Sequence, residues 1–164
     1  MGEIERYRER VEAAWREVAA LSRVGWGQPG PADPQTGERW DRANVLGHMA
    51  EMLPFWTGQV RAAVGGETVF GRGETGYAER RRAIETGREV GEEELLARID
   101  SGLAGLLGLL TEMREEDLDR KLTYQSQGGD REVDLRYPVE ELLVGHVEAH
   151  LRQLAELGQG GAGP

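Results

Sequence analysis

The sequence predicts an all-α protein: a four-helix bundle with a long crossover between helices 2 and 3 and a short β-hairpin before helix 4. Three observations support this fold class. Four segments repeat apolar residues at spacings of three and four, which is the period of an amphipathic helix. The connection over residues 65–91 is long enough to cross the bundle instead of making a tight turn. Polar and apolar residues alternate around a glycine turn just before the last helical segment.

The first three helices follow from apolar periodicity and from residues that begin or break helices. Residues 3–22 carry apolar side chains on one face and charged ones elsewhere, which predicts the first helix. Residues 23–39 contain too many glycines and prolines for a regular element, so we expect a long loop there. Asp41 is a candidate N-cap for the second helix, which we expect to end near Val64. The third helix is expected over residues 92–114, with leucines on its inner face.

The C-terminal third combines a hairpin with a helix. Residues 121–137 alternate around a Gly-Gly-Asp turn, which predicts two short antiparallel strands. Residues 138–157 follow as the fourth helix, and Gly158 is a natural stop for it. At this chain length we expect one domain over residues 1–157 and a disordered, glycine-rich tail over residues 158–164.

Composition limits the function classes. The chain has 164 residues and a formal charge of −10, which argues against nucleic acid or an anionic membrane as a partner. It contains no cysteine, so it offers neither a disulfide framework nor a thiol nucleophile of its own. No run approaches about 18 apolar residues, and the charged N-terminal stretch does not resemble a signal sequence. We therefore expect a soluble cytoplasmic protein.

All three histidines fall on apolar helix faces. His146 and His150 lie one turn apart within the apolar stripe of the fourth helix, and His48 lies within the stripe of the second. Burying a polar ring without a partner costs roughly 1–3 kcal/mol, so these positions need an explanation. If the two helices face each other, three neutral imidazoles converge on a site for a divalent metal, with positions left for water or substrate. The alternative is three core histidines that only form hydrogen bonds.

The residues around the histidines narrow the metal chemistry. Val147, Glu148 and Ala149 separate the pair, so the His-Glu-x-x-His arrangement of zinc proteases is absent. The Glu-x-x-His pairs of di-iron bundles are absent as well. Three histidines with open positions favour zinc or nickel, with iron or manganese as alternatives. Gln153 and Asn44, each one turn from a histidine, are candidates to orient the rings through their second nitrogen, although a surface or packing role fits either residue equally well.

Aromatic residues are the remaining candidates for a pocket. Their rings offer flat apolar walls, but at such positions aromatic side chains more often belong to the core. Four residues leave both interpretations open: Trp40, Trp56, Tyr124 and Tyr137.

Taken together, these motifs resemble the DinB/YfiT-like metalloenzymes. The second helix opens with Trp40 and carries His48 eight residues later, and residues 146–154 form a His-x-x-x-His-x-x-Gln-Leu motif. The resemblance covers nearly the whole chain, including the long connection and the glycine turn. It implies a four-helix bundle, frequent homodimers and a divalent metal held by His48, His146 and His150.

The resemblance also implies a chemistry. The family includes thiol S-transferases that use bacillithiol or mycothiol, and a mycothiol-dependent maleylpyruvate isomerase. The isomerase branch resembles this chain less, because it has a glutamate among its ligands where His146 stands. We therefore expect a metal-dependent thiol S-transferase or detoxification enzyme that acts on a small-molecule substrate with an external low-molecular-weight thiol. A metal-dependent hydrolase, a non-catalytic metal-binding stress-response dimer and a purely structural bundle are the alternatives.

Overall fold

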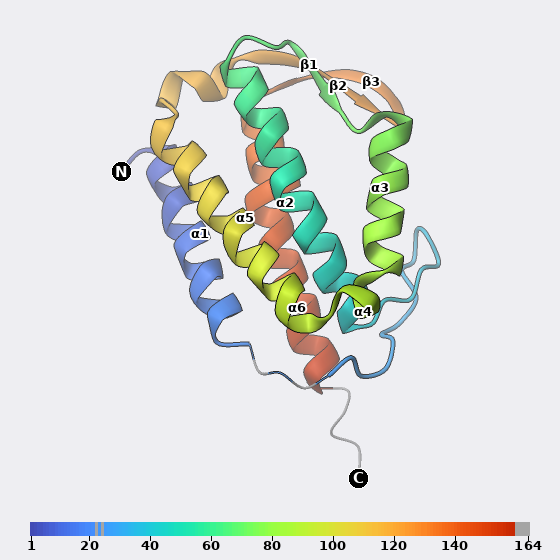
Figure 1. Ribbon diagram of the computed structural model, residues 1–164. Helices are drawn as coiled ribbons and strands as arrows, with labels where there is room; N and C mark the ends of the chain where they lie inside the picture. The colour runs from blue at the N-terminus through green and yellow to red at the C-terminus, as the bar shows by residue number, and fades with distance from the viewer. Residues whose placement is uncertain (22, 24, 160–164) are drawn as a thin grey trace.

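The computed structural model describes residues 1–21, 23 and 25–159. This part of the chain is mostly helical and adds one small three-stranded sheet, which confirms a predominantly α fold (Figure 1). The helices are α1 Glu3–Ala19, α2 Arg42–Val64, α3 Gly73–Glu85, α4 Gly87–Val90, α5 Glu92–Glu112 and α6 Gly145–Gln159, with a 3-10 helix η1 over Glu115–Asp119 and a π-helix η2 over Pro138–Val144. The strands are β1 Val69–Gly71, β2 Lys121–Ser126 and β3 Gly129–Asp134.

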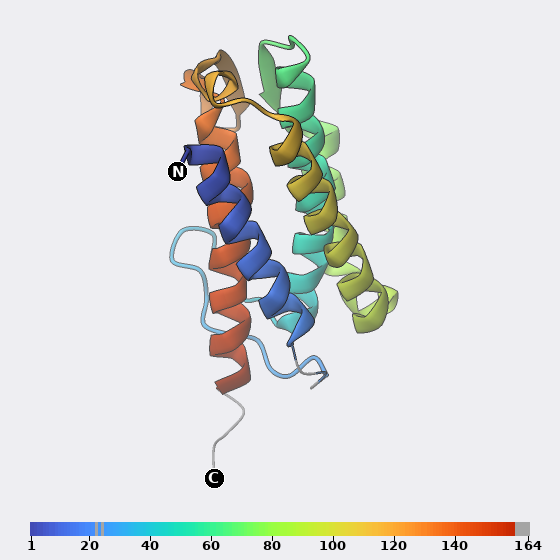
Figure 2. The ribbon, with the colours of Figure 1, turned by 90° about the vertical axis from the view of Figure 1, so that its left-hand side faces the viewer.

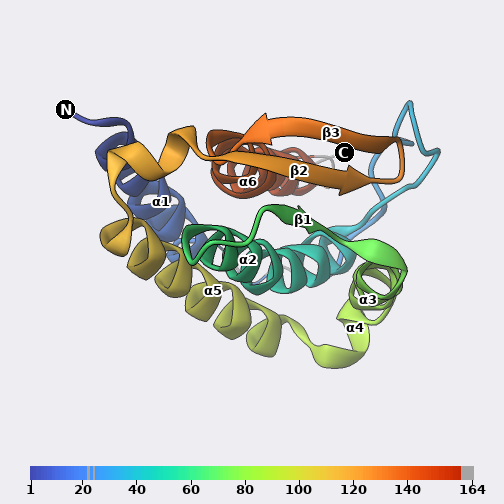
Figure 3. The same ribbon diagram turned by 90° about the horizontal axis from the view of Figure 1, so that it is seen from above.

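Helix α2 is the centre of the fold. It packs against α5, α3, α6 and α4, and Figure 3 shows it lying between its neighbours. Most of its residues are buried, as expected for a helix that other elements surround. Asp41 caps its first turn as predicted. The Asp41 carboxylate accepts a hydrogen bond from Asn44 N at 3.0 Å, and Asn44 Oδ1 accepts one from Asp41 N at 2.9 Å.

Helix α1 covers the groove between α5 and α6 and contacts both (Figure 2). It buries one face at the predicted spacing of three and four residues, through Ile4, Tyr7, Val11, Ala14 and Val18. It ends at Ala19, earlier than the predicted residue 22. At the other end of the chain, α6 extends to Gln159, past the predicted stop at Gly158, and the rest of the predicted tail lies outside the described residues. No helix in the described part of the chain combines the length and the apolar character needed to cross a membrane.

The sheet lies across one end of the long helices, with strand order β1-β2-β3 (Figure 3). Strands β2 and β3 form the predicted antiparallel hairpin, with Leu122 opposite Val133. Strand β1 pairs with β2 in parallel and was not predicted, because three residues within a glycine-rich connection show no periodicity. Gly71 permits this pairing. It has a φ of 149°, and a Cβ there would collide with the carbonyl oxygen of Gln125.

The chain enters α6 through the π-helix over Pro138–Val144, where a regular α-helix was predicted. The hydrogen bond from Gly145 N to Glu140 O spans five residues, one more than in an α-helix. Gly145 suits this turn, since a Cβ there would lie 2.8 Å from that carbonyl oxygen. The prediction of one regular helix from residue 138 was therefore wrong. The extra residue in the turn changes the register between the sheet and the first turn of α6.

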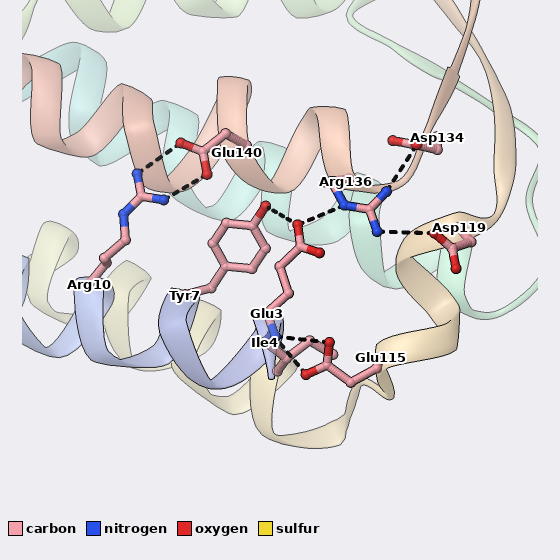
Figure 4. Close-up of polar contacts among 9 residues, drawn as sticks. All are labelled: Glu3, Ile4, Tyr7, Arg10, Glu115, Asp119, Asp134, Arg136 and Glu140. Carbon is pink, nitrogen blue, oxygen red and sulfur yellow. Dashed lines mark hydrogen bonds and ion pairs between the residues drawn. The ribbon is translucent and has the colours of Figure 1, made fainter. Parts of the chain in front are cut away.

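Polar side chains tie α1 to the segments near the sheet (Figure 4). The carboxylate of Glu115, from η1, accepts hydrogen bonds from Glu3 N and Ile4 N, both at 3.0 Å, and so caps the N-terminus of α1. Arg136 donates to three carboxylates around the same corner, those of Glu3, Asp119 and Asp134. These contacts fix the first turn of α1 against the segment that leads into α6.

Arg10 on α1 contacts both sides of the π-helix turn. Its guanidinium donates to the Glu140 carboxylate at 2.7 and 2.8 Å, which Figure 4 shows, and to the Glu148 carboxylate at 2.8 and 2.7 Å. Glu140 belongs to the π-helix and Glu148 to α6. One side chain thus holds the irregular turn and the regular helix together. The hydrogen bonds from Arg10 lower the pKa of the Glu140 carboxyl.

Gly47→Ala should destabilise the protein. Helix α2 passes the end of α3 so closely that a Cβ on Gly47 would collide with the carbonyl oxygen of Ala83. We expect the free energy of unfolding to fall by ~1–3 kcal/mol, the usual cost of overpacking, in urea denaturation. Gly105→Ala on α5 is the matched control, because nothing lies within 4 Å of its Cβ position, and it should raise stability by ~0.5–1 kcal/mol. Equal effects in the two variants would contradict the close helix contact.

Arg10→Met should weaken the fold more at neutral pH than at acidic pH. Arg10 holds the folded-state pKa of Glu140 below its ordinary value of 4.5. As pH falls through that window the unfolded state binds more protons than the folded state, so the stabilisation is present above the unfolded pKa and lost below the folded one. Both carboxylates are about one-third exposed. In urea denaturation we therefore expect Arg10→Met to lower the free energy of unfolding by ~1 kcal/mol at pH 7, and by less as the pH falls toward 3.

The control for this variant is Arg98→Met. Arg98 pairs with Glu94 on the same helix, and both side chains are more than half exposed. The free energy of unfolding of Arg98→Met should fall by less than ~0.5 kcal/mol at pH 7. A loss in Arg10→Met that is independent of pH would show that Arg10 contributes packing and no ion pair.

Candidate metal centre

The structure brings the three histidines together between α2 and α6. His48 comes from α2, and His146 and His150 come from successive turns of α6. One ring nitrogen from each residue lies within 4.8 Å of the other two, and the ring centroids are 4.6 to 5.2 Å apart. His48 is 2% exposed and His150 is 9% exposed, while His146 is partly buried. The predicted convergence of the two apolar stripes is present in the geometry, whereas metal binding stays a prediction.

Burial keeps all three rings neutral. It lowers the pKa of His146 to about 3, lowers the pKa of His48 well below its ordinary value, and lowers the pKa of His150. For His48 and His146 the other rings add to this effect, because a charge on a neighbouring histidine would repel a second proton. A neutral imidazole keeps a lone pair on one nitrogen, and this is the form that binds a metal.

Gln153 orients the ring of His150. The Gln153 side-chain oxygen Oε1 lies 2.9 Å from His150 Nδ1. An amide oxygen only accepts, so Nδ1 carries the proton and Nε2 keeps its lone pair. That Nε2 atom is buried and has no hydrogen-bond partner in the described part of the chain. Gln153 therefore makes the contact expected of an orienting residue, and it leaves the nitrogen that a metal ligand requires.

His48 and His146 face each other through their Nε2 atoms, which are 3.3 Å apart. Burial lowers the pKa of His146, and the backbone of Leu142, one turn earlier, opposes that shift. On the other side of His48, the buried Nδ1 has no hydrogen-bond partner within the described residues, and Glu51 Oε2 lies 4.0 Å away. Arg72 holds the Glu51 carboxylate at 2.6 and 2.8 Å. Glu51 thus stands near the second nitrogen of His48, where metal-bound histidines commonly have a carboxylate.

These residues fit a divalent metal. Two nitrogens that each bind one tetrahedral zinc ion at about 2.0–2.1 Å lie about 3.3 Å apart, which matches the separation of 3.3 Å between His48 and His146. The buried Nε2 of His150 lacks a partner in the described region, which costs stability unless something binds it. Within that same region no fourth protein group joins the cluster, so positions remain for water or a substrate.

A cavity of about 350 Å³ opens beside the three histidines. Trp40 forms one wall, with its ring stacked on His150 at a centroid distance of 5.9 Å and edge-on to His48 at 5.3 Å. The loop segment 31–38 and Arg80 from α3 form the other walls. A second cavity of about 500 Å³ adjoins the first beside Trp40, under the same loop. The cluster is therefore open to a space that holds a small molecule.

Asn44 does not orient His48. Its side-chain oxygen accepts from Asp41 N, and its Nδ2 donates to Ile84 O at 2.9 Å. Of the hydrogen bonds that the structure describes for Asn44, none reaches a histidine. Of the two roles left open for Asn44, the packing role therefore holds, because a residue three positions after Asp41 is placed to complete the helix cap and to anchor α3.

Of the four aromatic candidates, Trp40 lines the cavity beside the histidines. Trp56 is 4% exposed and packs within the core. Tyr124 lies on β2, where its ring stacks on Phe70 at 4.8 Å and contacts Tyr137 at 5.5 Å. For these three residues the packing alternative holds.

Sequence reasoning missed two residues near the cluster. Glu51 follows His48 by three positions, so the helical period was a usable signal for it. Arg80 stands first in a run of three arginines on a polar helix, and only the packing of α3 beside the cavity distinguishes it from the next two.

The helical fold and the converging histidines define a DinB-like domain, as the resemblance implied. A family model described as the mycothiol maleylpyruvate isomerase N-terminal domain matches residues 7–150. The chain therefore belongs to this family, which lies within the DinB-like superfamily. The name of this family model is that of the maleylpyruvate isomerase branch. On sequence alone, that branch ranked as less similar to this chain, because it has a glutamate ligand where His146 stands. No curated protein and no solved structure matches the chain.

In the metal-free protein, His150 should carry its proton on Nδ1, with Nε2 unprotonated. Nitrogen chemical shifts in two-dimensional ¹H–¹⁵N NMR distinguish the two tautomers. Gln153→Ala removes the acceptor and should shift the population toward the Nε2–H form, whereas Gln153→Glu keeps an acceptor and should retain Nδ1–H. A protonated Nε2 in the wild-type protein would contradict the orientation described here.

Proposed function

We propose that this protein is a metal-dependent thiol enzyme, in which His48, His146 and His150 hold a divalent metal and an external low-molecular-weight thiol is the nucleophile. The observation that carries the proposal is a cluster of three neutral imidazoles beside a cavity of about 350 Å³. The ligand set suits zinc or nickel, with iron or manganese as alternatives. The family name favours mycothiol as the thiol, and bacillithiol is the alternative.

The chain's own residues position the reacting groups. Gln153 holds His150 in the tautomer with a free Nε2, and Glu51 stands behind His48. Trp40 forms one wall of the cavity and stacks on the ring of His150. A divalent metal bound here would supply a Lewis acid that lowers the pKa of a thiol toward neutrality. Because the sequence has no cysteine, the nucleophilic sulfur has to come from a separate thiol molecule.

Thiol transfer is the reaction that we place first. The thiolate sulfur forms a bond to the β-carbon of an α,β-unsaturated carbonyl compound, and the displaced π electron pair ends on the α-carbon, which takes a proton from solvent. The thioether is then released. His146 supports this choice, because the resemblance places a glutamate there in the isomerase branch.

A cis–trans isomerisation is the second candidate, and the family name favours it. It shares the first bond-forming step. Rotation about the new single bond and expulsion of the thiolate then restore the double bond, so that thiol is not consumed. Consumption of thiol therefore separates the two reactions. A hydrolase, in which water replaces the thiol, has less support because the family name contains a thiol.

The open cavity favours an enzyme over a non-catalytic metal protein, because a purely structural metal site is closed by protein ligands. The proposal also includes a bundle architecture and an oligomeric state, both of which rest on the family resemblance. The long helices are those of a four-helix bundle, and two copies of the chain associate as a homodimer.

The test is a thiol-transfer assay on protein reconstituted with zinc or nickel. Mycothiol and bacillithiol are each supplied with a panel of model electrophiles, and both thiol loss and adduct formation are followed. We expect turnover that chelation abolishes and that needs the thiol. Turnover of substrate without thiol loss would favour isomerisation, and turnover without any thiol would favour hydrolysis. No rate above the chelated protein across the panel would count against an enzyme.

His150→Ala should lower metal affinity by at least about a hundredfold while leaving helicity nearly unchanged, because apolar packing, and not the metal, holds most of the helices together. Calorimetric titration with zinc and circular dichroism measure the two quantities. Arg152→Ala, an exposed change on the same helix, is the control and should bind zinc as the wild type does. Unfolding of His150→Ala would show a structural role for that histidine.

A further inference from the structure

The guanidinium of Arg80 has no carboxylate partner in the part of the chain that the structure describes. Arg80 comes from α3, is partly buried, and lines the same cavity as the three histidines. Its Cζ lies 5.7 Å from the centroid of the Trp40 ring. Among the described residues, no carboxylate forms an ion pair or hydrogen bond with it within 4.0 Å. The only partner shown for its charged end is therefore the face of Trp40, which leaves its planar set of donors free.

The two most buried arginines in the described part of the chain are neutralised by carboxylates. Arg72 is 3% exposed in its side chain and pairs with Glu51, and Arg42 is 8% exposed and pairs with Glu92. Removing a cation from water without a partner costs several kcal/mol, so pairing is the expected solution. Arg80 is partly buried, as is Arg8, whose Nε also lacks a partner within the described residues, but of these two only Arg80 lines the cavity beside the histidines. This position indicates that the anion for Arg80 comes with a ligand.

The charge balance of the site points the same way. Three neutral imidazoles would leave the charge of a divalent metal uncompensated, and Arg80 adds a further positive charge. The same charge contributes to lowering the pKa of all three histidines. Glu51, the carboxylate beside His48, is already paired with Arg72. Two positive centres facing one cavity therefore favour a ligand that carries negative charge.

Two acidic residues of the loop line the outer part of this cavity, but neither pairs with Arg80. The Asp33 carboxylate accepts hydrogen bonds from Gln35 N and Thr36 N, both at 2.8 Å, and Glu38 bonds to Thr36. Their hydrogen bonds hold both acids within the loop. Their negative charge also disfavours a dianion such as a phosphate monoester more than it disfavours a singly charged group.

We propose that Arg80 binds a carboxylate on the small molecule that occupies this cavity, so that the site takes carboxylate-bearing ligands. A guanidinium presents parallel N–H donors that match the two oxygens of a carboxylate, and Trp40 supports its face. The volume of about 350 Å³ suits a small organic acid. This inference rests on the proposed function in that it concerns the ligand of the same site. The carboxylate belongs either to the electrophilic substrate or to the thiol.

The test compares acids with neutral amides of the same shape in calorimetric titrations of the zinc-loaded protein. Crotonate against crotonamide examines the electrophile, and 3-mercaptopropionate against 3-mercaptopropionamide examines the thiol. We expect the acid to bind about tenfold or more tightly than the amide in at least one pair. The pair that shows the preference identifies the molecule that carries the carboxylate.

Arg80→Gln should abolish this preference. Arg81→Gln, the same change of charge at the next residue, should retain it, because Arg81 is exposed and does not line the cavity. Arg80→Gln should also bind zinc more tightly than the wild type, since a repelling charge has been removed. Arg80→Gln should thus lose the preference for acids while its affinity for zinc rises. Local damage to the site would instead weaken the binding of both the acid and zinc.

Arg80→Met, which keeps the unbranched stem over Trp40, replaces Arg80→Gln if that variant does not fold. A preference for acids that survives in the folded Arg80 variant would overturn the inference, as would equal binding of acids and amides by the wild type. If the wild type binds no zinc, the proposed function fails. The crotonate and crotonamide titrations are then made on the metal-free protein and decide the role of Arg80 independently.

Discussion

The burial of three imidazole rings against one another is the constraint on which the rest of this structure depends. Burial and the closeness of the rings disfavour their charged forms, which lowers the pKa values of His48, His146 and His150. Neutral rings still need partners for their nitrogens. Gln153 supplies one, and two buried nitrogens remain without a partner in the part of the chain described. The fold therefore keeps, at a cost in stability, buried ring nitrogens without hydrogen bonds, which simple core packing would avoid.

The scaffold holds this arrangement from outside the cluster. The hairpin delivers the chain to the π-helix, whose extra residue sets the register of α6 and hence the direction of His146. Arg10 joins the π-helix to α6 from α1, and Glu115 fixes the start of α1 in turn. On the opposite side, the close contact of α2 with the end of α3 at Gly47 sets how near α3 can come to the cavity. The positions of the rings and of the cavity walls thus depend on contacts far from the histidines.

The sequence was sufficient wherever one periodic pattern decides the outcome. The apolar stripes located the long helices and showed that all three histidines face inward, and Gln153 followed from its spacing of three from His150. It was insufficient where tertiary contacts decide. Apolar spacing hardly distinguishes a π-turn from an α-turn over seven residues, and β1 is too short to show alternation. The sequence left the role of Asn44 open, because the spacing that would reach His48 also completes a helix cap.

The proposed ligand set and Arg80 would together determine the charge balance of the site. A carboxylate ligand would cancel part of the charge of a divalent metal, whereas three imidazoles cancel none of it. A thiolate would then restore only one negative charge, and the guanidinium of Arg80 would still face the cavity without an anion. A site with this balance would bind a neutral thiol and a neutral electrophile poorly, because neither molecule would neutralise the positive charge of Arg80. With a histidine at position 146, an acidic group on one of the two small molecules would therefore add more to binding than it would beside a glutamate.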